Sequence, residues 1–197
     1  MRGKAPVSVA AATLPGMADT TRDTGGEQGG RPEVRLRAVV EADLELFLAH
    51  EHDPEAVRRS RFTPRPRDAF LAHWRQRVLG DPDCLVRTVT VGGEVAGSFV
   101  SWTQDDRRFL GYWLGRPYWG RGIGTRALAL FLHEEPARPL YADPFAGNEA
   151  SVRLLERHGF ERAGTVRYGG NEHILLVLPG PAGPPARPAP ADPGEAP

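Results

Sequence analysis

The fold of this chain is decided by residues 109–128, which read FLGYWLGRPYWGRGIGTRAL. The stretch begins with a run typical of a strand (109–114), passes through a turn rich in glycine and continues into a helical pattern (125–133). Glycine lets the backbone approach a ligand closely and adopt a positive φ. The first turn of the helix offers unpaired N–H groups and the positive end of the helix dipole. The turn is therefore suited to bind a pyrophosphate.

Two common nucleotide motifs do not fit this turn. It lacks the Gly-Lys-Ser/Thr ending of an NTPase phosphate loop. Its spacing is Gly-x-Gly-x-Gly, so it has no glycine where the dinucleotide fingerprint Gly-x-Gly-x-x-Gly has its third. Taken alone, the turn is equally compatible with a tight connection between a strand and a helix. Binding of a nucleotide phosphate remains an alternative at this point.

Outward from this stretch, hydrophobic periodicity predicts the rest of the fold. The predicted strands are 34–39, 85–91, 94–102, 109–114, 139–142, 162–168 and 173–178, and the predicted helices are 41–51, 68–80, 125–133 and 148–158. The pairs Gly92-Gly93 and Gly169-Gly170 indicate two hairpins. This order of elements predicts an α+β fold, with a mixed sheet and helices on its faces.

The length of 197 residues fits one domain with tails. Residues 1–32 have the composition of a disordered extension, 33–178 form the folded domain, and 179–197 form a disordered tail rich in proline and alanine. Arg2 and Lys4 precede a short apolar run, but the run is too short for a secretory signal, and Met17 is a second candidate start. We therefore expect a cytoplasmic protein.

Charge and cysteine content exclude several classes of partner. The 25 Lys and Arg residues balance 25 Asp and Glu residues, so no net field attracts nucleic acid or anionic lipid. No stretch approaches the ~20 apolar residues of a membrane span. Cys84 is the single cysteine, and the histidines lack the spacing of metal ligands. We expect no metal, nucleic acid or membrane, and the sequence leaves a homodimer open.

Two segments together resemble the GNAT acetyltransferase superfamily. They are residues 109–128 and residues 148–160, NEASVRLLERHGF. The resemblance is strongest to the branch that includes ribosomal-protein N-terminal acetyltransferases, where Gly-Tyr-Trp-Leu and Tyr-Trp-Gly-Arg/Lys-Gly are habitual. It covers residues 33–178. It implies the GNAT fold: a mostly antiparallel central sheet, helices on both faces, and a splayed cleft for the cofactor.

The resemblance also implies acetyl-CoA as the co-substrate and a set of residues that bind it. These residues are Trp113, Leu114, Trp119, Gly120, Arg121, Gly122, Ile123, Gly124, Thr125, Asn148 and Ser151. In these roles, N–H groups of the turn hold the pyrophosphate. Backbone groups of Trp113 and Leu114 meet the pantetheine and the thioester carbonyl, and Asn148 binds the pantetheine. A preorganised N–H at that carbonyl is often worth ~3 kcal/mol of barrier.

The catalytic acid and base are implied less directly. Leu155 stands where many relatives carry a tyrosine that protonates the leaving thiolate. Ser151 is the candidate substitute, although a serine in a first helical turn also simply bonds the backbone. Asp143, Glu172 and His173 are candidate bases, because the short strand and the last hairpin border the acceptor cleft in the family. Each also has a structural explanation in a turn or on a hairpin surface.

The function implied is transfer of an acetyl group to a primary amine by direct attack in a ternary complex. The acceptor is a small molecule or a protein N-terminus. The arginine-rich segment 58–67 either selects an acidic or phosphorylated acceptor or forms a solvated basic loop. A second hypothesis is an acyl-CoA-binding sensor without turnover, because the usual acid is missing and a fold does not guarantee a function.

Overall fold

The computed structural model describes residues 32–180, and seven strands within this range form one sheet in the order β1-β2-β3-β4-β5-β7-β6. The strands are β1 (Val34–Arg37), β2 (Leu85–Val91), β3 (Glu94–Gln104), β4 (Arg107–Leu114), β5 (Leu140–Ala142), β6 (Glu161–Tyr168) and β7 (Asn171–Leu178). Only β4 and β5 pair in parallel. The predictions for residues 1–31 and 181–197, including a start at Met17, lie outside the described residues.

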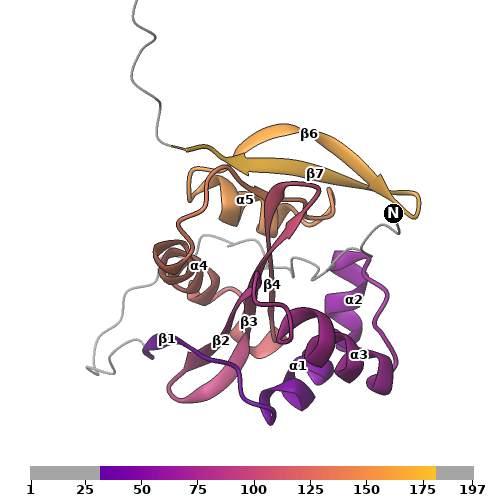
Figure 1. Ribbon diagram of the computed structural model, residues 1–197, viewed down its shortest axis with the longest axis vertical. Helices are drawn as coiled ribbons and strands as arrows, with labels where there is room; N and C mark the ends of the chain where they lie inside the picture. The colour runs from indigo at the N-terminus through magenta and orange to yellow at the C-terminus, as the bar shows by residue number, and fades with distance from the viewer. Residues whose placement is uncertain (1–31, 181–197) are drawn as a thin grey trace, which may run out of the picture.

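In the part of the chain that the structure describes, five α-helices and two short helical turns accompany the sheet. They are α1 (Asp43–Glu51), α2 (Pro54–Ser60), α3 (Arg67–His73), the π-helical turn η1 (Trp74–Val78), the 3-10 turn η2 (Arg116–Tyr118), α4 (Ile123–Glu134) and α5 (Glu149–Glu156). Figure 1 shows α1, α2 and α3 grouped on one side of the strands, and α4 and α5 on the other. The α+β class and the helices on both faces are therefore confirmed.

Helix α2 precedes and overlaps the start of the arginine-rich segment 58–67, and it was not predicted. The Asp53 side chain accepts the N–H groups of Glu55 and Ala56, which caps the start of the helix. Pro54 occupies the first helical position, where its missing N–H costs nothing. The helix ends at Arg61, which has φ 54°. The sequence Asp-Pro-Glu at residues 53–55 is thus a signal for the start of a helix. The helix has only seven residues, which is too few for hydrophobic periodicity to support that signal.

Two hydrophobic clusters pack on the two faces of the sheet. The larger cluster joins strand residues such as Phe99 and Leu114 to Ile123 of α4 and Leu155 of α5. The smaller cluster joins α1, α3 and η1 to the opposite face of the sheet, and its members include Leu44, Phe70, Trp74 and Trp102. Along β3, Phe99 belongs to the larger cluster and its neighbour Val100 to the smaller one, because successive side chains of a strand point to opposite faces.

The sheet splits between β4 and β5. Their ladder contains only the pairs Arg108–Leu140 and Phe109–Tyr141, while β5 continues its pairing on the other side with β7. Within residues 32–180, residues 110–114 of β4 therefore have no strand partner at this edge. The two strands separate here, as the splay implied by the resemblance requires. Within residues 32–180, no helix combines the length and apolar character needed to cross a membrane.

Candidate active site

Beyond the two residue pairs that join β4 to β5 there is a gap between these strands. The backbone N–H and C=O groups of successive β4 residues point alternately toward β3 and toward this gap. The N–H of Gly115 donates to the carbonyl of Ala96, 2.9 Å away. This bond lies one residue beyond the last β3–β4 pair, Gly97–Leu114. Successive N–H groups of a strand point to opposite sides. The N–H of Trp113 therefore faces β3, whereas the N–H groups of Tyr112 and Leu114 face the gap.

Trp113 is turned away from the gap in both its backbone and its side chain. An added Cβ at Gly97 would collide with the Trp113 carbonyl, so this carbonyl points to β3. The indole donates to the carbonyl of His50, 2.9 Å away on α1. Two consecutive residues of one strand cannot both face the same edge, so of the pair named from the sequence, Trp113 and Leu114, only Leu114 presents its N–H to the gap.

The glycine-rich turn has the conformation that its sequence requires. Gly120 and Gly122 have φ values of 68° and 69°, which favour glycine. Gly122 caps α4 from the left-handed region, and the turn is exposed at Gly120, Arg121 and Gly122. The N–H groups of residues 123–125 lie in the first turn of α4, where no carbonyl of the helix can accept them. They are available to an anion such as a pyrophosphate.

Helix α5 meets β4 through a pair of buried hydroxyl groups. Asn148 caps α5, since its side chain accepts the N–H of Ser151 at 3.2 Å. The Ser151 hydroxyl and the Tyr112 hydroxyl are hydrogen-bonded at 2.5 Å. Burial raises the pKa of the Tyr112 phenol, against the opposite effect of the bond to Ser151. The phenol therefore keeps its proton, and Tyr112 brings a second hydroxyl to the helix whose usual tyrosine is replaced by Leu155.

Sequence reasoning missed Tyr112 as a polar partner. The residue lies at an inward position of a strand, stacked on Phe99 with ring centroids 4.8 Å apart. A buried tyrosine hydroxyl normally finds a hydrogen-bond partner, and this rule was the available signal. The partner itself was not predictable, because Ser151 lies 39 residues further along the chain.

Asp143 and His173 lie together beside the gap. Asp143 follows β5 directly, and its carboxylate accepts the Tyr168 hydroxyl at 2.7 Å. Its carbonyl lies 2.8 Å from Nδ1 of His173. Burial raises the pKa of the Asp143 carboxyl, while the Tyr168 hydrogen bond and the His173 charge act in the opposite direction. Leu140 and Ala142 pack toward α4 and α5, so the Asp143 side chain faces the other side of the sheet.

The hydrogen bond between Nδ1 of His173 and the Asp143 carbonyl determines which ring nitrogen of His173 can accept a proton. A carbonyl oxygen only accepts, so Nδ1 of His173 carries the proton in its bond to Asp143. In the neutral ring, Nε2 then keeps its lone pair and can accept a proton. Glu172 points elsewhere: it is exposed and lies 3.5 Å from Arg167 in an ion pair. The structure thus brings two of the three candidate bases together and separates the third.

Three of the five arginines in the segment 58–67 form ion pairs. Arg58 and Arg59 both pair with Glu55 on α2, and Arg67 pairs with Glu45 on α1.

Among residues 32–180, no group of three histidine, cysteine, aspartate or glutamate side chains is placed to hold a metal ion.

The chain belongs to the GNAT acetyltransferase domain family. A family profile described as "Acetyltransferase (GNAT) domain" matches residues 33–161. Acetyl-CoA is the co-substrate of this family, and the exposed turn and the gap-facing N–H groups are suited to hold it.

Solved structures share the fold. The aminoglycoside acetyltransferase AAC(6')-Ib with coenzyme A has 21% identity and a TM-score of 0.62, over 74% of this chain and 94% of that chain. Its complex with paromomycin and acetyl-CoA has 22% identity and a TM-score of 0.62, over 74% and 93%. A domain from Methanocaldococcus jannaschii has 19% identity and a TM-score of 0.61, over 75% and 99%.

Proposed function

We propose that this chain is an N-acetyltransferase that moves the acetyl group of acetyl-CoA to a primary amine. The observation that carries the proposal is the separation of β4 and β5 after two residue pairs. Three features follow the ends of these strands and support the proposal. They are the N–H groups of Tyr112 and Leu114 that face the gap, the glycine-rich turn after β4, and the hydrogen-bonded Asp143 and His173 after β5. All of them come from one chain, so a homodimer is not required for chemistry.

The donor half of the site follows from the direction of β4. With the pyrophosphate at residues 120–125, the pantetheine arm lies extended along β4 and takes the place of a neighbouring strand. The strand rises ~3.3 Å per residue, so the thioester reaches Tyr112 after the pantetheine has passed Leu114. The N–H of Tyr112 then donates to the carbonyl oxygen that becomes the oxyanion. One such donor is worth roughly 3 kcal/mol of barrier.

The acceptor half supplies proton transfer. The amine nitrogen attacks the thioester carbonyl, and its proton passes to Nε2 of His173. The C–S bond then breaks and the CoA thiolate takes a proton from the Ser151–Tyr112 hydroxyl pair, whose members are hydrogen-bonded. The proton that His173 took from the amine is released to water, and water returns a proton to the pair, so both sites are restored. We favour a small-molecule amine, as in the paromomycin complex of AAC(6')-Ib. A protein N-terminus, as in the ribosomal-protein branch, is the second candidate acceptor.

The proposal is tested by release of free thiol from acetyl-CoA with a panel of aminoglycosides, polyamines and short peptides. Release with at least one amine is expected. His173→Gln should lower kcat about 100-fold, the lower range for loss of a general base, with the CoA dissociation constant unchanged. Glu172→Gln is the matched control and should behave as wild type.

Two outcomes would contradict the proposal. Tight CoA binding without thiol release across the panel would favour a non-catalytic sensor. ATP or NAD affinity equal to that for CoA would favour a nucleotide-phosphate site.

The role of the hydroxyl pair has its own test. If Ser151 and Tyr112 protonate the thiolate, Ser151→Ala and Tyr112→Phe should each lower kcat and leave CoA binding intact. If the pair only fastens α5 to β4, the same variants should lower the melting temperature and retain kcat.

A further inference from the structure

Trp119 reaches the edge of β4 that faces the gap. Its side chain is 8% exposed, and its indole N–H donates to the carbonyl of Leu114 at 2.7 Å. In a strand, the carbonyl and the N–H of one residue point to the same side. The Leu114 carbonyl therefore faces the gap, and the indole takes the position that an N–H of a neighbouring strand would occupy.

We propose that Trp119 is a positioning residue for acetyl transfer, which holds the gap-facing edge of β4 in register with the pyrophosphate turn. The inference rests on the proposed function at this gap. The strand needs such a restraint, because residues 110–114 have lost β5 as a partner. Reacting groups must be held within ~0.5 Å of their productive positions, and an unpaired strand end does not meet that requirement by itself.

Helix α2 holds the indole from the other side. The guanidinium carbon of Arg59 lies 5.3 Å from the centre of the Trp119 ring, a distance typical of a cation–π contact. Arg59 is held in turn by Glu55 on the same helix. The indole is thereby enclosed between the end of β4 and α2, so that its N–H has one direction available.

The segment around Trp119 is fastened to the same helical layer at two more points. Asp53, the cap of α2, pairs with Arg116 at 3.0 Å. The imidazole of His50 packs so closely on Gly115 that an added Cβ would lie 2.5 Å from its Nε2. Thus α1 and α2, which belong to the acceptor face of the sheet, fix the backbone that binds the acetyl donor.

The test compares three variants in steady-state acetyl transfer. Trp119→Phe keeps an aromatic ring and removes the N–H, and Arg59→Leu removes the cation over the ring. We expect Trp119→Phe to lower kcat about 5- to 10-fold, the size expected for one hydrogen bond, and Arg59→Leu to lower it about 3-fold. Although the resemblance places Trp119 among the residues that bind CoA, its indole N–H is used by the Leu114 carbonyl, so the CoA dissociation constant should stay within about twofold of wild type.

Arg58→Leu is the matched control. Arg58 also pairs with Glu55, and its side chain is 67% exposed. This variant should keep the wild-type kcat. The inference is overturned if Trp119→Phe keeps the wild-type kcat, or if kcat, CoA affinity and melting temperature all fall together.

Hydrogen exchange separates this inference from the proposed function. If the wild-type protein binds CoA and turns over no amine, the enzymatic proposal fails. The positioning role is then measured in the CoA complex, where Trp119→Phe should speed exchange of the Leu114 amide at least threefold, again the scale of one hydrogen bond. An unchanged rate would overturn the inference independently of any activity.

Discussion

Glu51 is a carboxyl group that the fold keeps from water at the end of α1. It is 3% exposed, and within residues 32–180 its Oε2 has no hydrogen-bond partner. Burial raises its pKa to about 8, although the charge of Arg65 acts in the opposite direction. The folded protein therefore binds a proton at this site at neutral pH, while the unfolded chain releases it above its ordinary pKa of 4.5.

This difference makes Glu51 a source of instability that grows with pH. Because the folded pKa is the higher one, the cost is absent below about pH 4.5 and increases until about pH 8. Glu51→Gln should raise the free energy of unfolding by about 3 kcal/mol at pH 7 and by almost nothing at pH 4. Urea unfolding at several pH values checks this. A gain that is equal at pH 4 and pH 7 would contradict it, and Glu45→Gln on the exposed face of α1 is the control.

At the scale of the element, α2 depends on its cap. Asp53 accepts two N–H groups of the first turn and also pairs with Arg116. Asp53→Ala should lower the free energy of unfolding by about 1 kcal/mol. Asp53→Asn keeps an oxygen for the cap and removes the charge, so it should retain most of that stability. Equal losses in the two variants would assign the stability to the ion pair instead.

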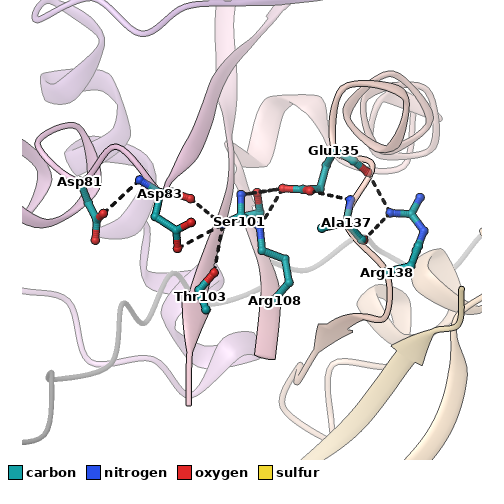
Figure 2. Close-up of polar contacts among 8 residues, drawn as sticks. All are labelled: Asp81, Asp83, Ser101, Thr103, Arg108, Glu135, Ala137 and Arg138. Atoms are coloured by element: carbon teal, nitrogen blue, oxygen red, sulfur yellow. Dashed lines mark hydrogen bonds and ion pairs between the residues drawn. The ribbon is translucent and has the colours of Figure 1, made fainter. Parts of the chain in front are cut away.

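A buried ionic network joins the end of α4 to β3 and β4 (Figure 2). Glu135 is 3% exposed and accepts hydrogen bonds from Arg108, Ser101 and the N–H of Ala137. Burial by itself would raise the pKa of Glu135, and the hydrogen bonds from Ser101 and Arg108 outweigh it, so the pKa is lowered. The carboxylate therefore stabilises the fold at neutral pH, and this contribution is lost as the pH falls through the lowered pKa.

Breaking this network should be costly. Glu135→Ala leaves the guanidinium of Arg108 without its carboxylate in a site where Arg108 is 16% exposed, and should lower the free energy of unfolding by about 3–5 kcal/mol. The double variant Arg108→Met with Glu135→Leu removes both charges and should recover most of the loss. Chemical denaturation of both variants checks this. A double variant no more stable than Glu135→Ala would contradict it.

At the scale of the whole molecule, the two parts of the sheet meet through two residue pairs between β4 and β5. We predict that the amides of Tyr112 and Leu114, which face the gap, exchange with solvent faster than the amide of Trp113, which faces β3. Coenzyme A should protect the first two at least about tenfold, because its pantetheine arm replaces the missing strand. Hydrogen exchange followed by NMR measures each amide. Protection of Trp113 alone would contradict this arrangement.

Local signals predicted most elements of this fold. Periodicity and glycine pairs placed the strands and both hairpins, and α3 with η1 fills the predicted helix 68–80. Helix α2 was missed because it is only two turns long, and in seven residues periodicity carries little weight. The β3–β4 turn was also missed: Asp105 and Asp106 adopt φ values of 49° and 59°, which aspartate tolerates without the glycine that marks such turns.

The sequence by itself determined the glycine turn, the α+β class and the family resemblance, because each depends on residues close together in the chain. Only the tertiary structure decided which groups meet at the gap. Tyr112 bonds Ser151 across 39 residues, and Tyr168 bonds Asp143 across 25. Such contacts depend on strand order and register, which local patterns do not encode. The same register turned the backbone N–H of Tyr112, instead of that of Trp113, toward the gap between β4 and β5, because a strand presents only alternate residues to each edge.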